Sequence, residues 1–374
     1  MSKTNNTYHE FYTENGLRVI PIDDYPIDYV LKMVSDGGFL PSSSHPSENT
    51  LASVVDYQQR TNNYGFSKAI GMYCDEVLSG IMFLPVFKTR YNNTSYYCVQ
   101  TAAIYIYPQY RGVFKTMVQC LLANYRQTLK LFMFSAPQVH KTGEKFGFFE
   151  VCQHVFAYNR YRILAPFSFI SSSINTPILK KLVGLFCIFD GLFTPPLYRD
   201  ETEVFENPHF DGDYTAIEKD YYITYGEKLV PEWNREVLLA KYGAACHSMS
   251  KQCSYNSTFH IVACRQNIIC GSMVLKAIPG FRRLVIVEWH ATENKRNQTL
   301  KAMLCFVTRK AATLKYEALM FKGLGADYEG ILNRGFVMKK KSPHRVFVSN
   351  DIEALNKLSQ HDYTFFYSSD DINF

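Results

Sequence analysis

Six consecutive residues have the types and spacing of an anion-binding turn: Gln109, Tyr110, Arg111, Gly112, Val113 and Phe114. Proline at position 108 ends the stretch before them, and Gly112 permits a tight backbone turn. The first N–H groups of a helix have no partner within that helix. Together with the positive end of the helix dipole and the charge of Arg111, they favour a phosphate or pyrophosphate. The pattern therefore predicts phosphate binding at this turn.

Two elements must position the turn. Residues 102–107 are apolar, aromatic and β-branched, which is typical of a buried strand. Residues 113–125 carry apolar side chains at helical spacing, which predicts a helix with one buried face. The strand then leads directly into the helix. An ordinary turn of an α/β domain, without any ligand, is the alternative explanation of the same pattern.

The six residues resemble the pyrophosphate loop of the GNAT acetyltransferases, written Q/R-x-x-G-x-G/A. The first four positions fit, and Phe114 departs from the last. The order downstream strengthens the resemblance: an apolar strand at 129–135 precedes a short helical stretch that ends in residues 145–148, KFGF, similar to the family's K-L-G-F. The phenylalanine variant is similar to a subgroup of GNAT proteins of bacterial surface polysaccharide synthesis, whose loop tends to read R-G-x-G-I-F.

Composition limits the classes of function. With 374 residues, of which 47% are hydrophobic and 20% charged, the chain is long enough for two or three domains. The net charge of +6 is spread along the chain, apart from the triplet at 339–341, so we expect no nucleic-acid partner. The ten cysteines include no Cys-x-x-Cys pair and mostly lie in apolar runs, which is typical of small core residues in a reducing compartment.

The N-terminal residues lack an apolar signal core, and no run of eighteen apolar residues occurs, so we expect a cytoplasmic protein. The longest apolar run, residues 182–193, is interrupted by Asp190 and is too short to span a bilayer. A core helix is the favoured interpretation of this run. The alternative is an interfacial segment that rests on a membrane or a partner, as in peripheral membrane association.

The first part of the chain has the element order β-α-α-β-β-β-α-β-α-β. Two helices after the first strand suit the GNAT order, in which they help to shape the acceptor cleft. The predicted strands are residues 16–22, 67–73, 78–87, 96–107, 129–135 and 150–158, and the first two predicted helices are residues 27–34 and 51–60.

The second part repeats much of this order. Helices are predicted at 233–242, 300–314 and 327–333, with strands at 259–264, 268–276, 283–290 and 318–322. Its strand-to-helix turn, residues 291–298, contains no glycine, so a phosphate nest is not expected there. We interpret this part as an acceptor-site or structural partner. The predicted division is an N-terminal GNAT domain at 1–160, a connecting segment at 161–225, and a C-terminal GNAT-like domain at 226–374 without cofactor.

The resemblance implies an α+β (α/β) fold with two GNAT-like domains, each a mixed, mainly antiparallel twisted sheet flanked by helices. It implies an acyltransferase that moves an acetyl group from acetyl-CoA to an amine or hydroxyl acceptor, a small molecule or sugar. The polysaccharide subgroup points to an amino sugar or nucleotide-linked sugar. Residues 233–235 and the aromatic, acidic end at 363–371 are similar to motifs of that subgroup, although the glycine of the latter is absent.

The resemblance also implies roles for particular residues. A splayed or bulged backbone near Ile104 to Ile106 would polarise the thioester carbonyl. Gln138 would bond the pantetheine arm, with a helix N-terminal residue as its structural alternative. The tyrosine that usually acts as the general acid in this family is missing, because its position falls on Gly143. His140 and Tyr105 are the remaining catalytic candidates, with a helix cap and a core aromatic as their respective structural alternatives.

Other chemistries lack a motif. The sequence contains no metal-binding pattern, no serine-hydrolase elbow and no Walker loop, so we expect no metal. Two alternatives to the acetyltransferase remain. One is a non-catalytic GNAT-fold binding or scaffold protein, which lost its acid. The other is a Fem-type aminoacyl transferase, which would need a basic groove for tRNA.

Overall fold

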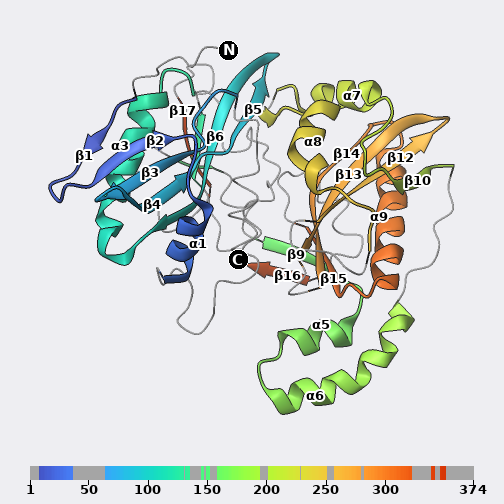
Figure 1. Ribbon diagram of the computed structural model, residues 1–374. Coiled ribbons are helices and arrows are strands. Elements are labelled where there is room, and N and C mark those ends of the chain that lie inside the picture. Colours follow the sequence, from blue (N-terminus) through green and yellow to red (C-terminus); the bar gives the residue numbers. More distant parts are fainter. Residues whose placement is uncertain are drawn as a thin grey trace.

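The chain builds two β-sheets that share one order of strands (Figure 1). The structure is a computed structural model, and it describes residues 8–36, 64–129, 131–134, 145–146, 149–151, 158–193, 201–227, 229–250, 257–278, 282–321, 338–341 and 346–350. The first sheet contains β1 (Phe11–Tyr12), β2 (Arg18–Ile22), β3 (Ala69–Cys74), β4 (Val77–Phe83), β5 (Val86–Tyr91), β6 (Thr94–Ile106), β7 (Leu131–Phe134), β8 (Phe149–Val151), β11 (Val230–Pro231) and β17 (Val346–Asn350).

The second sheet and the helices complete the described elements. The sheet contains β9 (Tyr158–Ile163), β10 (Glu203–Glu206), β12 (Thr258–Arg265), β13 (Ile268–Ile278), β14 (Arg283–Ala291), β15 (Ala318–Phe321) and β16 (Met338–Lys341). The α-helices are α1 (Ile27–Asp36), α3 (Phe114–Tyr125), α5 (Pro166–Ser173), α6 (Pro177–Leu185), α7 (Thr215–Tyr225), α8 (Arg235–Tyr242) and α9 (Arg296–Thr313), and the 3-10 helices are η1 (Pro108–Val113), η3 (Phe186–Phe193) and η4 (Gly243–Ala245).

The two sheets correspond strand by strand. The order β2-β3-β4-β6-β7-β17-β8 in the first sheet matches β10-β12-β13-β14-β15-β9-β16 in the second. In both, one central pair is parallel, β6 with β7 and β14 with β15, and a helix connects the two members of that pair. Every other pairing between these strands is antiparallel. The predicted fold class, a mixed and mainly antiparallel sheet flanked by helices, is confirmed.

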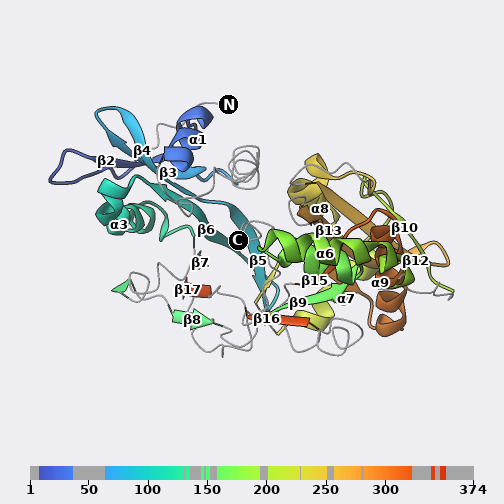
Figure 2. The same ribbon diagram turned by 90° about the horizontal axis from the view of Figure 1, so that it is seen from below.

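Each sheet contains one strand from the other half of the chain. β17, from the C-terminal end of the chain, lies between β7 and β8 of the first sheet, and β9, from the first half, lies between β15 and β16 of the second (Figure 2). The predicted strand at 150–158 was therefore wrong: β8 ends at Val151, and Tyr158 begins a strand of the other sheet. The domain boundaries stay a prediction. β17 nevertheless comes from the predicted C-terminal domain and lies in the first sheet, and β9 begins in the predicted N-terminal domain and lies in the second sheet.

Helices cover both faces of the first sheet. Met72 and Met82 belong to a cluster with Met117 and Leu121 of α3, whereas Ile81 and Phe83 belong to a cluster with the buried residues of α1. Successive side chains of a strand point to opposite faces, so α3 and α1 pack against opposite faces of the sheet. This arrangement fixes where α3 begins relative to the end of β6.

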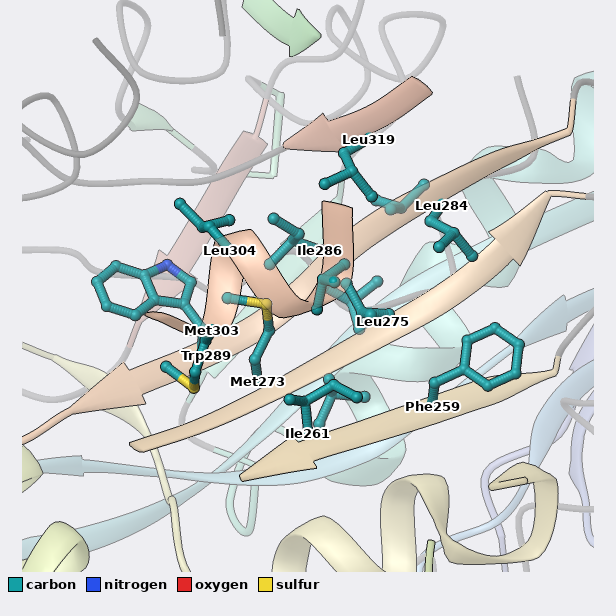
Figure 3. Packing of buried hydrophobic residues seen from close by; sticks show 14 of the residues in the cluster. Phe259, Ile261, Met273, Leu275, Leu284, Ile286, Trp289, Met303, Leu304 and Leu319 are labelled. Carbon is teal, nitrogen blue, oxygen red and sulfur yellow. The ribbon is translucent and has the colours of Figure 1, made fainter. Parts of the chain in front are cut away.

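The core of the second sheet repeats the packing of α3 with α9. Met303 and Leu304 of α9 lie with Met273, Leu275 and Ile286 of the strands in one buried cluster (Figure 3). Helix α9 contacts β12, β13 and β14. The helix predicted at 300–314 is confirmed and begins one turn earlier, at Arg296.

Several other predictions have a clear outcome. The strands predicted at 67–73 and 78–87 correspond to β3 and β4, which form a hairpin around Asp75 and Glu76, both with positive φ. β5 was not predicted as a separate strand. It forms a second hairpin with β6 around the turn at Asn92 and Asn93. All eight cysteines in the described residues are free thiols, and Cys187 and Cys305 are half-buried rather than core residues. No helix among the described residues combines the length and apolar character needed to cross a membrane.

Candidate functional site

The turn between β6 and α3 has an outer and an inner side. Gln109, Arg111 and Gly112 are exposed, whereas Tyr110, Val113 and Phe114 pack against the first-sheet core. The hydroxyl of Tyr110 donates a hydrogen bond to the sulfur of Cys74 at 3.4 Å, which ties the turn to the end of β3. This bond raises the pKa of Tyr110 above its ordinary value. The inner side thus holds the turn in place, and the outer side is open to a ligand.

The backbone of the turn is a 3-10 helix, which differs from the prediction in two respects. The N–H of Tyr110 donates to the carbonyl of Tyr107 at 2.8 Å, and the N–H of Phe114 donates to that of Arg111. Fewer donors are therefore free than the sequence suggested. Gly112 does not adopt a positive φ, and a Cβ built on it would meet no atom within 4 Å. The turn does not need glycine for its conformation, but the absence of a side chain leaves its backbone accessible.

The start of α3 favours a negative ligand. Its first turn contains no acidic residue, and no side chain caps it. The side chains of Arg111 and Lys115 are exposed beside it. Positive charges add to the favourable field at a helix N-terminus. A carboxylate does lie nearby, because the charge of Asp75 contributes to the raised pKa of Tyr110, but Asp75 belongs to the β3–β4 turn.

The end of β6 is bulged close to the turn. β6 pairs with β7 through residues 98–101 and with β4 through residues 102–106. The register of β4 and β6 shifts between Met82 and Phe83, because Ala103 has no partner of its own. The bulge lies one residue before the region that the resemblance implied. A bulge leaves its extra residue unpaired in the ladder, so the backbone there can contact a ligand.

The predicted side chains around this bulge have different outcomes. Ile104 and Ile106 pack into the core beneath α3, so only their backbone groups can contact a ligand. Tyr105 points to the opposite face, where its ring packs edge-on against Phe83 at 6.3 Å. This contact favours the core-aromatic alternative for Tyr105. Gln138 and His140 lie outside the described residues, and their roles stay predictions.

The corresponding turn of the second sheet has a similar backbone setting. β14 pairs with β15 through residues 283–286, and Val287 is the extra residue of a register shift against β13. The strand is therefore bulged like β6. α9 begins after Lys295, which adopts a left-handed φ of 61° without being glycine. The absence of glycine from this turn thus does not prevent a helix from starting there.

A carboxylate of this chain already occupies the start of α9. Oδ1 of Asp220, on α7, accepts the backbone N–H of Glu293 at 2.9 Å, and Oδ2 accepts a bond from Arg296 at 3.1 Å. Nε2 of His290 lies 3.0 Å from the same Oδ2. Burial lowers the pKa of His290, so we assign it as a neutral ring that donates this bond. Burial alone would raise the pKa of Asp220, but these three partners outweigh it and lower the pKa to about 2.

The two turns therefore differ in their charge. Asp220 places a negative charge where α9 begins, and the start of α3 has no acidic residue in its first turn. A phosphate at the start of α9 would meet the carboxylate, whereas at α3 it would meet two cations. No local pattern predicts the pairing of Asp220 with His290, because 70 residues of the sequence separate them. That cofactor binds only the first part of the chain stays a prediction, and this contrast supports it.

A groove between the β5–β6 turn and α7 does not belong to the same site. It encloses about 610 Å³ and is lined by Arg90, Asn92, Asn93, Lys219, Tyr222, Ile223 and Gly226. About ten residues of β6 separate this end from the bulge, which at about 3.3 Å per residue is roughly 30 Å. Among the described residues, no cluster of His, Cys, Asp or Glu side chains is suited to hold a metal ion.

Comparison with known proteins identifies the fold. A scan against family models and a search of curated proteins found no match. Among solved structures, N-myristoyltransferase from Saccharomyces cerevisiae with bound myristoyl-CoA is similar over 95% of this chain and 92% of its own, with a TM-score of 0.58 and 10% identity. A GCN5-related N-acetyltransferase from Anabaena variabilis is similar over 89% of this chain and 72% of its own, with a TM-score of 0.53 and 11% identity.

A third similar structure is a conserved protein of unknown function from Enterococcus faecalis V583, described as a probable N-acyltransferase. The similarity extends over 89% of this chain and 72% of that protein's chain, with a TM-score of 0.54 and 13% identity. Such low identities show the fold and leave the activity to be argued from the site. The chain has the GNAT fold. In the described residues this fold shows in the bulged strand β6, in its parallel pairing with β7, and in the helix α3 that connects the two.

Proposed function

We propose that this chain is an acyl-CoA N-acyltransferase that holds its donor at the turn between β6 and α3. The observation that carries the proposal is the contrast between the two strand-to-helix turns. Both follow a bulged strand, but the carboxylate of Asp220 lies at the second turn, whereas the first turn carries the exposed cationic side chains of Arg111 and Lys115. The GNAT-like setting and this charge together support a pyrophosphate-bearing donor at the first turn.

Three parts of coenzyme A match three features of the site. The pyrophosphate suits the exposed side of the turn, at Arg111, Gly112 and Lys115. The amides of the pantetheine arm suit the end of β6, because an extended chain can pair with strand backbone groups that a bulge leaves unpaired. The thioester carbonyl then falls near the bulge at Ala103, where a backbone N–H can stabilise the negative charge that develops on the carbonyl oxygen.

The reaction joins the acceptor nitrogen to the acyl carbon and breaks the carbon–sulfur bond. The amine loses a proton as it attacks, and the departing thiolate gains one. His140 remains the candidate to move a proton, and Tyr105 is the weaker candidate because its ring packs against Phe83. Gln138 remains the candidate to bond the pantetheine arm.

We further propose acetyl as the transferred group and an amino sugar or nucleotide-linked sugar as the acceptor, in a cytoplasmic enzyme of surface polysaccharide synthesis. Two of the similar structures are described as an N-acetyltransferase and an N-myristoyltransferase. Acetyl and myristoyl groups differ greatly in chain length. The length of the acyl chain is therefore the first variable to test. The acceptor follows from the sequence resemblance alone, so it is the second.

The central experiment titrates the full chain with acetyl-, octanoyl- and myristoyl-CoA by calorimetry. It then measures thiol release with a panel of amines and amino sugars. Binding of acetyl-CoA with release of free coenzyme A in the presence of an amino sugar supports the whole proposal. Binding of the long-chain donors alone would replace acetyl by a fatty acyl group. No binding of any donor at about 1 mM would remove the acyltransferase proposal.

A matched pair of variants locates the donor. Lys115→Glu places a negative charge beside the first turn, and Lys295→Glu does the same at the turn before α9. We expect the first to weaken coenzyme A binding roughly tenfold and the second to leave it unchanged. Equal effects of the two variants would contradict the assignment of the donor to the first turn.

One observation favours a non-catalytic binding protein. The N–H groups of Tyr110 and Phe114 already bond to carbonyls within the turn, so fewer donors are free for phosphate than in an open nest. The same experiments separate the two functions. A folded chain that binds no coenzyme A, or that binds it but releases no thiol with any acceptor, would be a binding or scaffold protein. The Fem-type alternative would instead require tRNA binding at physiological salt.

A further inference from the structure

A helical hairpin of residues 166–193 exposes an unusual amount of apolar surface. It consists of α5, α6 and η3, and follows β9. Seven large apolar side chains of α6 and η3 are at least half exposed to solvent, and two of them, Ile188 and Leu192, are 80% exposed. The seven and their neighbour in α5 are Ile178, Leu179, Leu182, Leu185, Phe186, Ile188 and Leu192, with Ile170.

Helix α5 anchors the hairpin to the second sheet. Phe169 is buried, with Arg283 lying 4.6 Å above its ring and Tyr161 beside it. The hydroxyl of Ser172 donates to Glu317 at 2.7 Å. α6, in contrast, has no buried residue. Helix α5 is therefore the fixed base of the hairpin, and α6 with η3 forms its exposed outer arm.

The outer arm was expected to be a core helix, and this prediction was wrong. Residues 182–193 are exposed or half-buried wherever the structure describes their side chains. A helix that is apolar on all sides is normally covered by something else. The alternative interpretation, an interfacial segment, is the one that fits the exposure.

The charges of the hairpin indicate what covers it. Its two cationic residues, Lys180 and Lys181, are exposed on α6. Its one acidic residue is Asp190, and that carboxylate faces inward, where it accepts the N–H groups of Phe167 and Ser168 and the hydroxyl of Ser168. The outer arm therefore presents apolar side chains with positive charge only, which is complementary to an anionic surface.

The shape of the hairpin favours lipid over a protein partner. The arm projects beyond the second sheet as a convex tip (Figure 1). A convex apolar tip with flanking lysines can enter the headgroup region of a bilayer without a preformed groove. α6 has nine residues, about 14 Å of helix, which is too short to cross a bilayer.

We propose that residues 166–193 dock this protein onto an anionic lipid surface. α6 and η3 lie in the plane of the membrane, with their leucine, isoleucine and phenylalanine side chains at the acyl boundary and Lys180 and Lys181 at the lipid phosphates. This inference does not depend on acyl transfer, because it uses neither the turn before α3 nor any ligand.

The test is sedimentation of the full chain with vesicles of phosphatidylcholine alone and of phosphatidylcholine with 30 mol% phosphatidylserine, at about 1 mM lipid. We expect binding to the mixed vesicles and at least roughly tenfold weaker binding without phosphatidylserine. Lys180→Glu with Lys181→Glu should reduce binding to the mixed vesicles by a similar factor. Absence of binding to the mixed vesicles, or equal binding to both kinds, would overturn the proposal.

Ile188→Asp with Leu192→Asp tests the apolar part, and we expect it to abolish measurable binding. Ile268→Asp is the matched control, since Ile268 is an exposed isoleucine that follows the β12–β13 turn. All variants must keep the thermal midpoint of the wild type, which is expected because the changed side chains are exposed. Wild-type binding by the double variant would overturn the proposal. So would a wild-type dimer in light scattering that the double variant lacks, because a second copy would then cover the hairpin.

Discussion

Asp220 and Glu293 are joined by a hydrogen bond of 2.9 Å, from the backbone N–H of Glu293 to Oδ1 of the aspartate. Through this bond α7 supplies a negative charge to the start of α9. The other carboxylate oxygen accepts bonds from His290 and Arg296. The second turn is therefore stabilised by a carboxylate of the chain, whereas the first is stabilised by packing of Tyr110, Val113 and Phe114.

Asp220→Asn should destabilise the protein by roughly 1–3 kcal/mol, because the buried side of the cluster loses its ionised acceptor. Asparagine can still accept one bond but carries no charge to pair with Arg296. Urea unfolding at pH 7 measures the difference. Asp213→Asn is the control: Asp213 is exposed and accepts the N–H of Thr215, a bond that asparagine can also accept, so this change should destabilise the protein less than Asp220→Asn. Equal stability of Asp220→Asn and wild type would contradict this account.

The contribution of Asp220 should depend on pH. Its pKa is lowered from 3.8 to about 2 in the folded protein, so the unfolded state binds a proton first. The stabilisation is therefore complete above about pH 5 and is lost as the pH falls toward 2, an amount of about 2 kcal/mol. The difference in unfolding free energy between wild type and Asp220→Asn should shrink over this range. A constant difference from pH 5 to pH 2 would show that the charge is not the cause.

His260 should make stability depend on pH in a higher range. Burial lowers its pKa from 6.5 to about 4, with the ring stacked on Phe210 at 4.1 Å and bonded to Asn207 and Ser272. The folded state holds it neutral, so stability is full above about pH 7 and falls by about 3 kcal/mol as the pH approaches 4.

His260→Asn keeps a donor near the position of Nδ1 and cannot titrate, so its stability should fall less between pH 7.5 and 4 than that of the wild type. His209→Asn, at an exposed position, serves as the control. Unfolding in urea at several pH values measures both slopes. Parallel slopes for His260→Asn and wild type would contradict the role of the buried ring.

Gly112→Asp should abolish coenzyme A binding while the fold is kept. The new Cβ meets open space, and an acidic residue near a helix N-terminus is stabilising by roughly 0.3–1 kcal/mol. The carboxylate would repel the phosphates. Gly112→Ala separates charge from size: it adds the same Cβ without charge and should bind more tightly than the aspartate variant. Calorimetry and thermal midpoints provide both measurements, and unchanged affinity in a folded Gly112→Asp would exclude this turn as the donor site.

Removal of β17 should damage the first sheet, although β17 lies near the C-terminal end of the sequence. β17 pairs with β7 and β8, so a chain that stops at residue 342 leaves both without their shared neighbour. We expect faster hydrogen exchange of the amides of residues 131–134. A chain that stops at residue 350 keeps β17 and is the matched control. Similar protection of these amides in both truncated chains would contradict the strand exchange.

Local patterns in the sequence predict much of the fold. The positions of β6, α3, β12, β13 and β14 follow from their spacing of apolar residues, and the strand-to-helix turn at residues 109–114 lies where it was expected. α7 was missed, although Ile217, Tyr221 and Tyr225 are spaced by four and are all buried, which is a helical signal. A closer application of the same rule would have found it.

Other features depend on contacts that no local pattern contains. The partners of β9 and β17 are set by the other half of the chain, so their sequences predict strands but not the sheet to which they belong. Asp220 meets Glu293 only because α7 packs across β14. Residues 182–193 are apolar like a core segment, but hydropathy does not say whether other residues of the chain cover them.

The exchange of β9 and β17 also has a consequence for how the protein is made. During synthesis the ribosome releases β7 long before β17, because roughly 200 residues separate Phe134 from Phe347, its partner in the sheet. At common rates of about 5–20 residues per second, the first sheet must wait roughly 10–40 s for the strand that completes it. In that interval β7 and β8 lack their shared neighbour, which is the condition in which chaperones bind nascent chains. Because β9 belongs in turn to the later sheet, neither half can finish folding before the other has been translated.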